Sequence, residues 1–397
     1  MSDIRDRALQ LTYWLSIAFC ICTVIWTQIV PLTQALSDGQ LVYGEYGTND
    51  FIEYWSAWHA YAAGLNPYDP YVMQATQRLV DPSIDVPLMM WNPPWILTLF
   101  SPILSLSFST AAILWLIVNF LIYLIAVRLY SNDKDALLLS LLFAPFWHSM
   151  FVGQLGSFLA LGAACIYRGL ISRISILIAV GILFLSLKPH FCIPLAIFIF
   201  WKEFFHGDKA IVARTGLILL LMLLIICTHM IELLQAWNQA INSATAIALV
   251  PHPKAWLSLT LVSYMRSIIP EICDVYLQRI YPIIPFICGL LLIIFNYYTA
   301  RLENNIKTFS LILFLVITNA PLAWVFDYAI IAPLAVRWLE NNNKTRFQSI
   351  LILLIQVYLF YVITQQPQEH HNLCWLVISI YVFIIYKYQC CMRNFKK

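Results

Sequence analysis

Long apolar runs alternate with short polar connections along most of this chain. A membrane-spanning helix needs about 20 consecutive apolar residues, and a shorter run can span when its flanks extend it. Such runs lie near residues 11–30, 108–130, 136–151, 155–168, 174–187, 190–201, 211–229, 280–300, 308–320, 327–339, 348–364 and 373–388. The pattern predicts an all-α polytopic membrane protein with about 10–12 transmembrane helices.

Composition supports this class and excludes others. Hydrophobic residues make up 61% of the 397 residues and charged residues only 11%, against about 25% charged in soluble proteins. We therefore expect one transmembrane domain over residues 1–397 that binds membrane lipids. The net charge of +3 comes without a basic, aromatic-interleaved patch, which argues against nucleic acid. The chain has no CxxC spacing, no obvious carboxylate cluster and no Gly-rich nucleotide loop, so we expect no metal and no cofactor.

The basic residues predict the topology. Most lysines and arginines lie in alternate connections and at both termini, which places both ends in the cytoplasm, as expected for a bacterial inner (plasma) membrane protein. Two large loops then face outward, at 31–107 and 230–279, and residues 340–397 form a C-terminal transmembrane pair. Within the first loop, Pro93 and Pro94 favour a short helix or re-entrant piece at 91–106, with the prolines in its first turn.

The first outer loop contains an aromatic amphipathic helix that begins near Asp50. Phe51, Trp55 and Trp58 share one face, which is typical of the lipid headgroup layer. Asp50, Tyr54 and Tyr61 form the adjacent stripe, which we expect to turn toward the protein. Gly64 ends the helix, and residues 66–69 form a turn.

Four polar features interrupt the apolar pattern, and the predicted topology places all of them on the outer face. They are Asp50, Gln154, Lys188 with His190, and Asp327. Ionisable groups at membrane depth are costly, so they usually have a function or a partner.

Each of these features also has a structural interpretation. Asp50 and Glu53 read as a helix capping box, and cap and catalyst are not exclusive. Lys188 can be a snorkelling lysine at a proline-broken turn between two spans. Asp327 can form an ion pair with Lys188 or cap a helix, and Gln154 can simply begin a helix. His190 can be a satisfied polar residue near the membrane interface.

The order of these pieces resembles the integral-membrane glycosyltransferases of the GT-C superfamily, in particular family 87 (DUF2029). The matching segments are Asn49-Asp-Phe51 with Tyr54, Ala62-Ala-Gly64, Asn66-Pro-Tyr-Asp69, Asn92-Pro-Pro94, Gly153-Gln154, Lys188-Pro189 and Phe326-Asp-Tyr328. The resemblance covers about residues 45–340. It implies a GT-C fold that takes a hexose such as mannose from a polyprenyl-phosphate-sugar donor.

The resemblance also suggests roles for individual residues. Asp50 resembles the catalytic aspartate of the first outer loop, while Lys188 and the second-loop residues Arg266 and His252 would hold the donor phosphate. We expect Tyr54, Trp58, Tyr61, Gln154, His190 and Asp327 to line the substrate site. Asp50 would act as general base for a lipid or glycan acceptor, which gives inversion at the anomeric carbon.

Two other functions fit a polytopic chain. A transporter or flippase of lipid-linked sugars predicts internal repeats with paired broken helices, and the sequence shows no convincing repeat. Another membrane transferase, such as a glycan polymerase, ligase or acyltransferase, remains an alternative; an acyltransferase would want a histidine deep in the bundle.

Overall fold

The computed structural model describes most of the chain up to residue 242 and three shorter parts of the rest. The described residues are 2–37, 50–131, 134–227, 230–242, 260, 287, 291, 305–318, 320, 323–331 and 346–365. His252 and Arg266 lie outside them, as do the predicted run at 373–388 and all but residues 287 and 291 of the run at 280–300.

Every regular element of the described residues is helical, which confirms the all-α prediction for this part. The first helices are α1 (Ser2–Val24), the π-helix η1 (Ile25–Ile29), α2 (Val30–Ser37), α3 (Phe51–Ala62), α4 (Pro70–Gln77), α5 (Trp95–Leu104) and α6 (Phe108–Tyr130). Next come α7 (Lys134–Ser140), α8 (Ala144–Val152), α9 (Gly156–Ser172), α10 (Ser175–Leu185), α11 (Pro189–His206), α12 (Lys209–Cys227) and α13 (Ile231–Asn242). The last are α18 (Asn305–Thr318), the 3-10 helix η3 (Val325–Ile331) and α20 (Arg346–Gln365).

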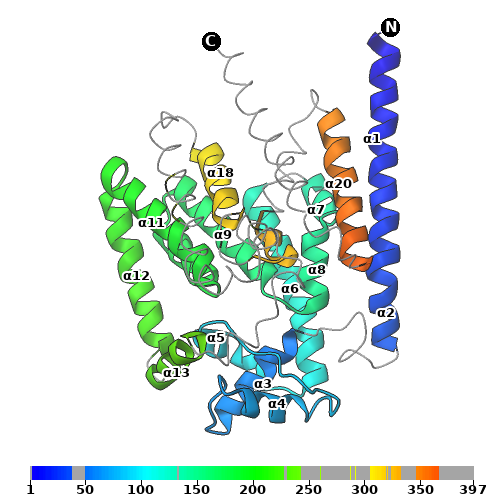
Figure 1. Ribbon diagram of the computed structural model, residues 1–397. Coiled ribbons are helices and arrows are strands. Elements are labelled where there is room, and N and C mark those ends of the chain that lie inside the picture. The colour runs from blue at the N-terminus through cyan, green and yellow to red at the C-terminus, as the bar shows by residue number, and fades with distance from the viewer. Residues whose placement is uncertain are drawn as a thin grey trace, which may run out of the picture.

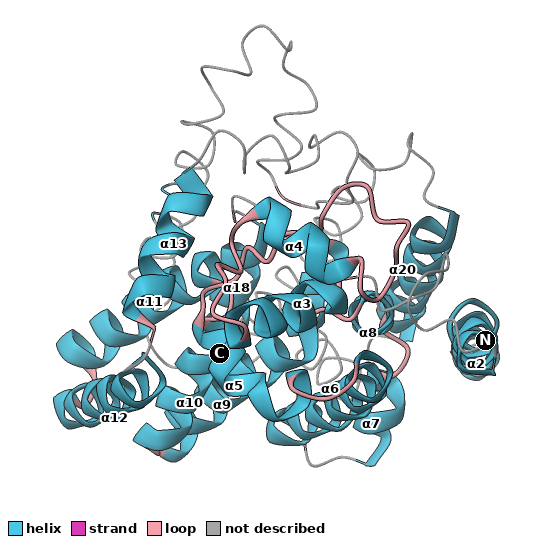
Figure 2. Cartoon of the chain, turned by 90° about the horizontal axis from the view of Figure 1, so that it is seen from below, coloured by secondary structure: helices cyan, strands magenta, loops and turns pink. Residues whose placement is uncertain are grey.

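The short helices of both predicted outer loops gather at one end of the molecule. In Figure 1, α3, α4, α5 and α13 lie at the bottom, at the opposite end from the start of α1. Viewed from that end, α3 and α4 lie across the ends of longer helices such as α6 (Figure 2). The indole nitrogen of Trp237 on α13 donates to the carbonyl of Trp91 at 3.0 Å. This bond ties the start of the second loop to the chain just before α5.

Most predicted apolar runs correspond to described helices, but one prediction is wrong. Residues 136–151 form two short helices, α7 and α8, in place of one continuous helix. The break at residues 141–143 is entirely apolar, so hydropathy does not reveal it. Pro145 lies in the first turn of α8, where proline favours the start of a new helix.

Two helical stretches among the described residues are long and apolar enough to cross a membrane. They are Gln10–Gln34 and Phe108–Tyr130, of 25 and 23 residues. The second packs in the bundle, whereas the first runs along the edge of the molecule beside α20 (Figure 1). Shorter apolar helices include Gly156–Ser172 and Ser175–Leu185.

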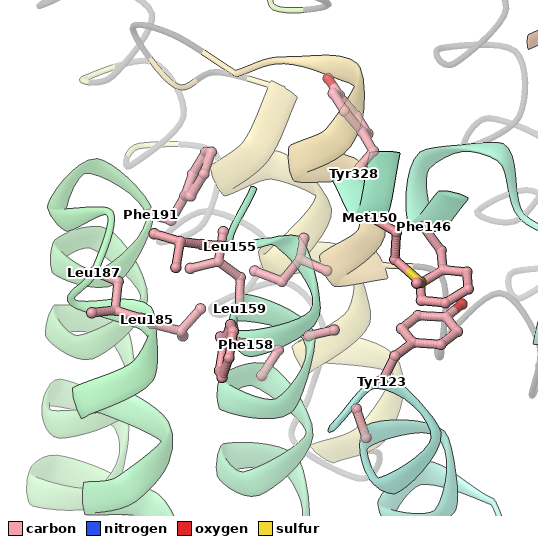
Figure 3. Close-up of a cluster of buried hydrophobic side chains, with 14 of the residues drawn as sticks. Tyr123, Phe146, Met150, Leu155, Phe158, Leu159, Leu185, Leu187, Phe191 and Tyr328 are labelled. Carbon is pink, nitrogen blue, oxygen red and sulfur yellow. The ribbon is translucent and has the colours of Figure 1, made fainter. Parts of the chain in front are cut away.

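The core is centred on α9, which packs against α6, α8, α10 and η3. Gly162 on α9 faces Gly181 on α10 so closely that a Cβ on Gly181 would lie 2.5 Å from the Gly162 carbonyl oxygen. Small residues therefore allow these two backbones to approach each other. Elsewhere in the core, the rings of Tyr123 on α6 and Phe146 on α8 stack with centroids 3.9 Å apart (Figure 3). This packed core supports the turn between α8 and α9, where the candidate site lies.

Candidate functional site

The N-terminus of α3 is held against the turn that joins α8 to α9. The backbone N–H of Asp50 donates to the Val152 carbonyl at 2.8 Å. Next to it, Gly153 has a φ of 76°, and a Cβ there would lie 2.6 Å from the Cβ of Phe51. The indole of Trp115 donates to the Gly153 carbonyl at 2.8 Å. Only glycine fits this turn without strain, and the contact brings Asp50 next to Gln154.

The side chain of Asp50 is oriented by Gln154. Gln154 Nε2 donates to Asp50 Oδ2 at 2.8 Å, and the Tyr54 hydroxyl donates to Gln154 Oε1 at 3.0 Å. Although Asp50 occupies the N-cap position of α3, its side chain makes no capping hydrogen bond. The capping-box hypothesis for Asp50 and Glu53 is therefore wrong for the Asp50 side chain. Instead, the Asp50 carboxylate, the Gln154 amide and the Tyr54 hydroxyl are hydrogen-bonded to one another.

Asp50 lies among several charges, and burial raises its pKa to about 6. The hydrogen bond from Gln154 and the positive charge of Lys188 lower the pKa, whereas the negative charge of Asp327 raises it. A carboxyl with this pKa is mostly ionised at neutral pH and close to the pH at which it exchanges a proton. That is the property required of a general base.

Glu53 is a second acidic group at this site, and its site role was not predicted. The residue is 8% exposed. Burial, followed by the charge of Asp50, raises the Glu53 pKa well above its usual range. The sequence signal was its position one helical turn after Asp50, which also fits a capping box. Burial and the charge of Asp50 thus both disfavour the ionised form of Glu53, because two like charges in one buried site repel each other.

Lys188 and Asp327 form the ion pair that was one of the open alternatives. Lys188 Nζ lies 2.6 Å from Asp327 Oδ1, and both side chains are buried. Asp327 Oδ2 accepts from the backbone N–H of Trp324 at 2.9 Å, and the Lys188 ammonium lies 4.7 Å from the ring centroid of Phe326. The pair joins the first residue before α11 to η3, at a place where neither charge is exposed to bulk water.

η3 reaches the site because the start of α9 has no side chain in its way. A Cβ on Gly156 would lie 2.7 Å from the Phe326 carbonyl oxygen. Gly156 also donates its N–H to Ser149 Oγ at 3.0 Å, which holds the α8–α9 turn. The same turn therefore brings Asp50 and Asp327 together through Gln154 on one side and Gly156 on the other.

The aromatic face of α3 differs from the prediction. Phe51 and Trp55, expected in the headgroup layer, are buried, because α3 packs against α5 and α6. The Trp55 indole donates to the Leu106 carbonyl at 2.9 Å. Trp58 and Tyr61 are half-buried, with ring centroids 5.9 Å apart, so they are the accessible aromatic surface of this helix.

The segment around Pro93 and Pro94 supports the site through hydrogen bonds of Asn92. The amide of Asn92 donates to the Leu187 carbonyl at 2.8 Å, and the Tyr68 hydroxyl donates to the Asn92 carbonyl at 3.0 Å. Asn92 thus joins the loop before α5 to the residue that precedes Lys188. The predicted short helix is present as α5, with Pro94 at its N-cap position and both prolines before its first turn.

The described residues bring together five of the predicted site residues: Asp50, Tyr54, Gln154, Lys188 and Asp327. His190 lies two residues after Lys188, half-buried in the first turn of α11, with its ring centroid 4.2 Å from that of Phe191. Within the described part of the chain, no group of three or more His, Cys, Asp or Glu residues could hold a metal ion.

Comparisons of this chain with protein-family models, with curated proteins and with solved structures find no match.

Proposed function

We propose that this protein is an integral membrane glycosyltransferase that moves a hexose from a polyprenyl-phosphate-sugar donor to a lipid or glycan acceptor. The supporting observation is the environment of Asp50. Its carboxylate stands at a helix N-terminus without capping that helix, is hydrogen-bonded by a buried amide, and has a pKa of about 6. A carboxylate held in this way is better suited to proton transfer than to a structural role.

In the proposed reaction, Asp50 accepts the proton of an acceptor hydroxyl while that oxygen attacks the anomeric carbon of the donor sugar. The bond from the anomeric carbon to the phosphate oxygen breaks, and the polyprenyl phosphate leaves with the electron pair. Attack from the face opposite the phosphate inverts the anomeric centre. One base is sufficient because phosphate is already a good leaving group.

Lys188 is the described cation whose charge acts on this base, and we assign it to the donor phosphate. Because Asp327 already neutralises Lys188 at 2.6 Å, a phosphate would have to share the ammonium with that carboxylate. A phosphate group therefore needs further positive charge. His252 and Arg266 of the second loop remain the predicted source.

Exposed apolar faces support embedding in a membrane. Large apolar side chains are exposed along α1, η1, α6 and α12, and include Leu11, Trp14, Leu15, Phe19, Trp26, Ile113, Ile117, Leu121, Ile125, Leu217, Leu220, Leu221, Leu224 and Ile225. Soluble proteins rarely expose contiguous apolar surface of this extent. We propose that lipid covers these faces and that the site around Asp50 opens to the outer side of the membrane.

The test is transfer of radiolabelled hexose by the full chain purified into lipid. Polyprenyl-phosphate mannose and polyprenyl-phosphate glucose are offered as donors in one arm and nucleotide sugars in the other, with a membrane lipid extract as acceptor. We expect transfer from a polyprenyl-phosphate donor and none from nucleotide sugars. Transfer from nucleotide sugars alone would contradict the donor class. Lack of transfer from every donor, together with movement of lipid-linked sugar across the same vesicles, would favour a flippase.

A further inference from the structure

Two buried side chains from distant parts of the sequence form a chain that ends on Asp50. Tyr54 is fully buried and Gln154 is 6% exposed. The phenol donates to Gln154 Oε1 at 3.0 Å, and Gln154 Nε2 donates to Asp50 Oδ2 at 2.8 Å. Tyr54 lies one helical turn after Asp50 on α3, so the chain closes a small ring through the α8–α9 turn.

We propose that Gln154 is a positioning residue for Asp50, and that the Tyr54 hydroxyl determines which end of the Gln154 amide faces the carboxylate. The importance of this positioning for catalysis rests on the proposed function, whereas the hydrogen bonds themselves do not. An amide has a donating and an accepting end, and an ionised carboxylate only accepts. The Tyr54 hydroxyl donates to the accepting end, although the Glu53 carboxyl also lies within reach of that hydroxyl. The donating end of the amide therefore faces Asp50.

This arrangement treats the two carboxylate oxygens of Asp50 differently. Oδ2 accepts from Gln154, whereas Oδ1 accepts no hydrogen bond from any residue that the structure describes. The backbone bond from Asp50 to Val152 and the bond from Trp115 to Gly153 hold both ends of the contact together. Oδ1 is therefore the oxygen that we assign to the acceptor hydroxyl.

Within the part of the chain that the structure describes, the charged and titratable groups that act on Asp50 or Glu53 come from three elements. Glu53 and Tyr54 lie on α3, Lys188 precedes α11, and Asp327 lies on η3. Among the uncharged groups of the described residues, Gln154 is the one that stabilises the ionised form of Asp50 through a direct hydrogen bond. Loss of that bond is expected to raise the Asp50 pKa, because the charged form loses a donor while burial remains.

The experiment is an infrared titration of the protonated carboxyl band in the full chain purified into lipid. The Asp50 signal is identified by subtraction of Asp50→Asn, and the Glu53 signal by subtraction of Glu53→Gln. Gln154→Leu is expected to raise the Asp50 pKa by about one unit, which is the size expected for one hydrogen bond to a charged group. Tyr54→Phe is expected to raise it by a smaller amount, because the amide then turns freely.

The double variant separates orientation from packing. In the Gln154→Leu background, Tyr54→Phe should change the Asp50 pKa less than it does in wild type, since no amide remains to be oriented and only the contact of Tyr54 with Glu53 is lost. A Gln154→Leu protein that melts like wild type but keeps the wild-type Asp50 pKa would overturn the proposal. An equal effect of Tyr54→Phe in both backgrounds would overturn the role of Tyr54. If Gln154→Leu does not fold, Gln154→Asn removes the reach of the amide by one methylene and is expected to give the same rise.

The outcomes distinguish this proposal from the proposed function. A pKa shift without sugar transfer by wild type would support the positioning role and contradict the glycosyltransferase. If transfer depends on Asp50 but the Asp50 pKa is the same in Gln154→Leu as in wild type, the result would support the enzyme and contradict the positioning role. When both hold, the pH at which transfer reaches half its maximum should move upward in Gln154→Leu by the same amount as the infrared pKa.

Discussion

Two aspartates stand at the N-cap positions of consecutive helices in the same loop, and they behave differently. Asp69, before α4, has extended backbone angles, and its Oδ1 accepts from the N–H groups of Tyr71 and Val72 at 2.8 and 3.3 Å. Asp50, before α3, has helical backbone angles and makes no capping hydrogen bond. Its carboxylate accepts from Gln154 instead, a residue 104 positions away.

The difference shows what a local motif can and cannot decide. A capping side chain needs the extended conformation of Asp69 to reach the N–H groups of the next turn. With its helical φ and ψ, Asp50 makes no such bond, so its carboxylate is available for a tertiary partner and a pKa of about 6. Asp69 thus stabilises its own helix, whereas the Asp50 side chain makes no such local contribution and is the better candidate for chemistry.

The largest predicted loss of stability is expected from Lys188→Met, which changes the surroundings of Asp50. This change leaves Asp327 as a buried charge without its 2.6 Å partner and removes the positive charge that lowers the Asp50 pKa. Breaking a buried ion pair from one side typically costs about 3–5 kcal/mol. The melting temperature in detergent should fall accordingly. Combining Lys188→Met with Asp327→Asn should recover part of the loss, because Asn still accepts from Trp324 and no charge remains; no recovery would contradict the pair's role.

The next prediction compares two glycines, one just after the end of α3 and one in the α8–α9 turn that contacts the start of α3. Gly153 and Gly64 have φ values of 76° and 74°, but a Cβ would lie 2.6 Å from Phe51 at Gly153 and would meet nothing within 4 Å at Gly64. Gly64→Ala should cost about 1 kcal/mol from backbone strain alone. Gly153→Ala should cost about 1–3 kcal/mol more through overpacking, and should displace Asp50. Equal melting temperatures for the two variants would show that the α3–α8 contact is not close.

The effects of replacing the two aspartates themselves have opposite signs. Asp69→Ala should lose about 1 kcal/mol of stability, the usual contribution of an N-cap side chain. Asp50→Asn should gain stability at pH 7.5, because a carboxyl with a raised pKa folds less favourably when it is ionised. As pH falls through about 6 toward 4, the Asp50 carboxyl becomes protonated in the folded chain and the gain should disappear. Thermal melts at pH 4.5 and 7.5 measure this; a loss of stability in Asp50→Asn at pH 7.5 would contradict the raised pKa.

Local sequence signals at helix ends predicted much of the structure of the first outer loop. Gly64 ends α3 with a positive φ, the turn at 66–69 leads into α4, and Pro94 precedes the short helix α5. The signals act over a few residues, so they can be read without the fold. The aromatic face of α3 was assigned wrongly because periodicity identifies a face but not its partner, and α6 covers Phe51.

The candidate site was predictable as a set of residues but not as a set of contacts. Ionisable groups in apolar surroundings pointed to Asp50, Lys188 and Asp327. Their partners are distant in sequence, 104 positions for Gln154 and Asp50 and 139 for Lys188 and Asp327. Only tertiary packing distinguishes a cap, an ion pair and a base among such residues. Glu53 was overlooked as part of the site because its position also fitted the capping box.

The most direct test of the account compares Asp50→Asn with Asp69→Ala in one sugar-transfer assay, in the same lipid and with the active polyprenyl-phosphate donor. A general base typically contributes about 10²–10⁴-fold to the rate. We expect Asp50→Asn to lose at least about a hundredfold in transfer rate while it melts no lower than wild type. Asp69→Ala should melt lower and keep a transfer rate within about threefold of wild type. Similar transfer rates for wild type and Asp50→Asn would contradict the central claim.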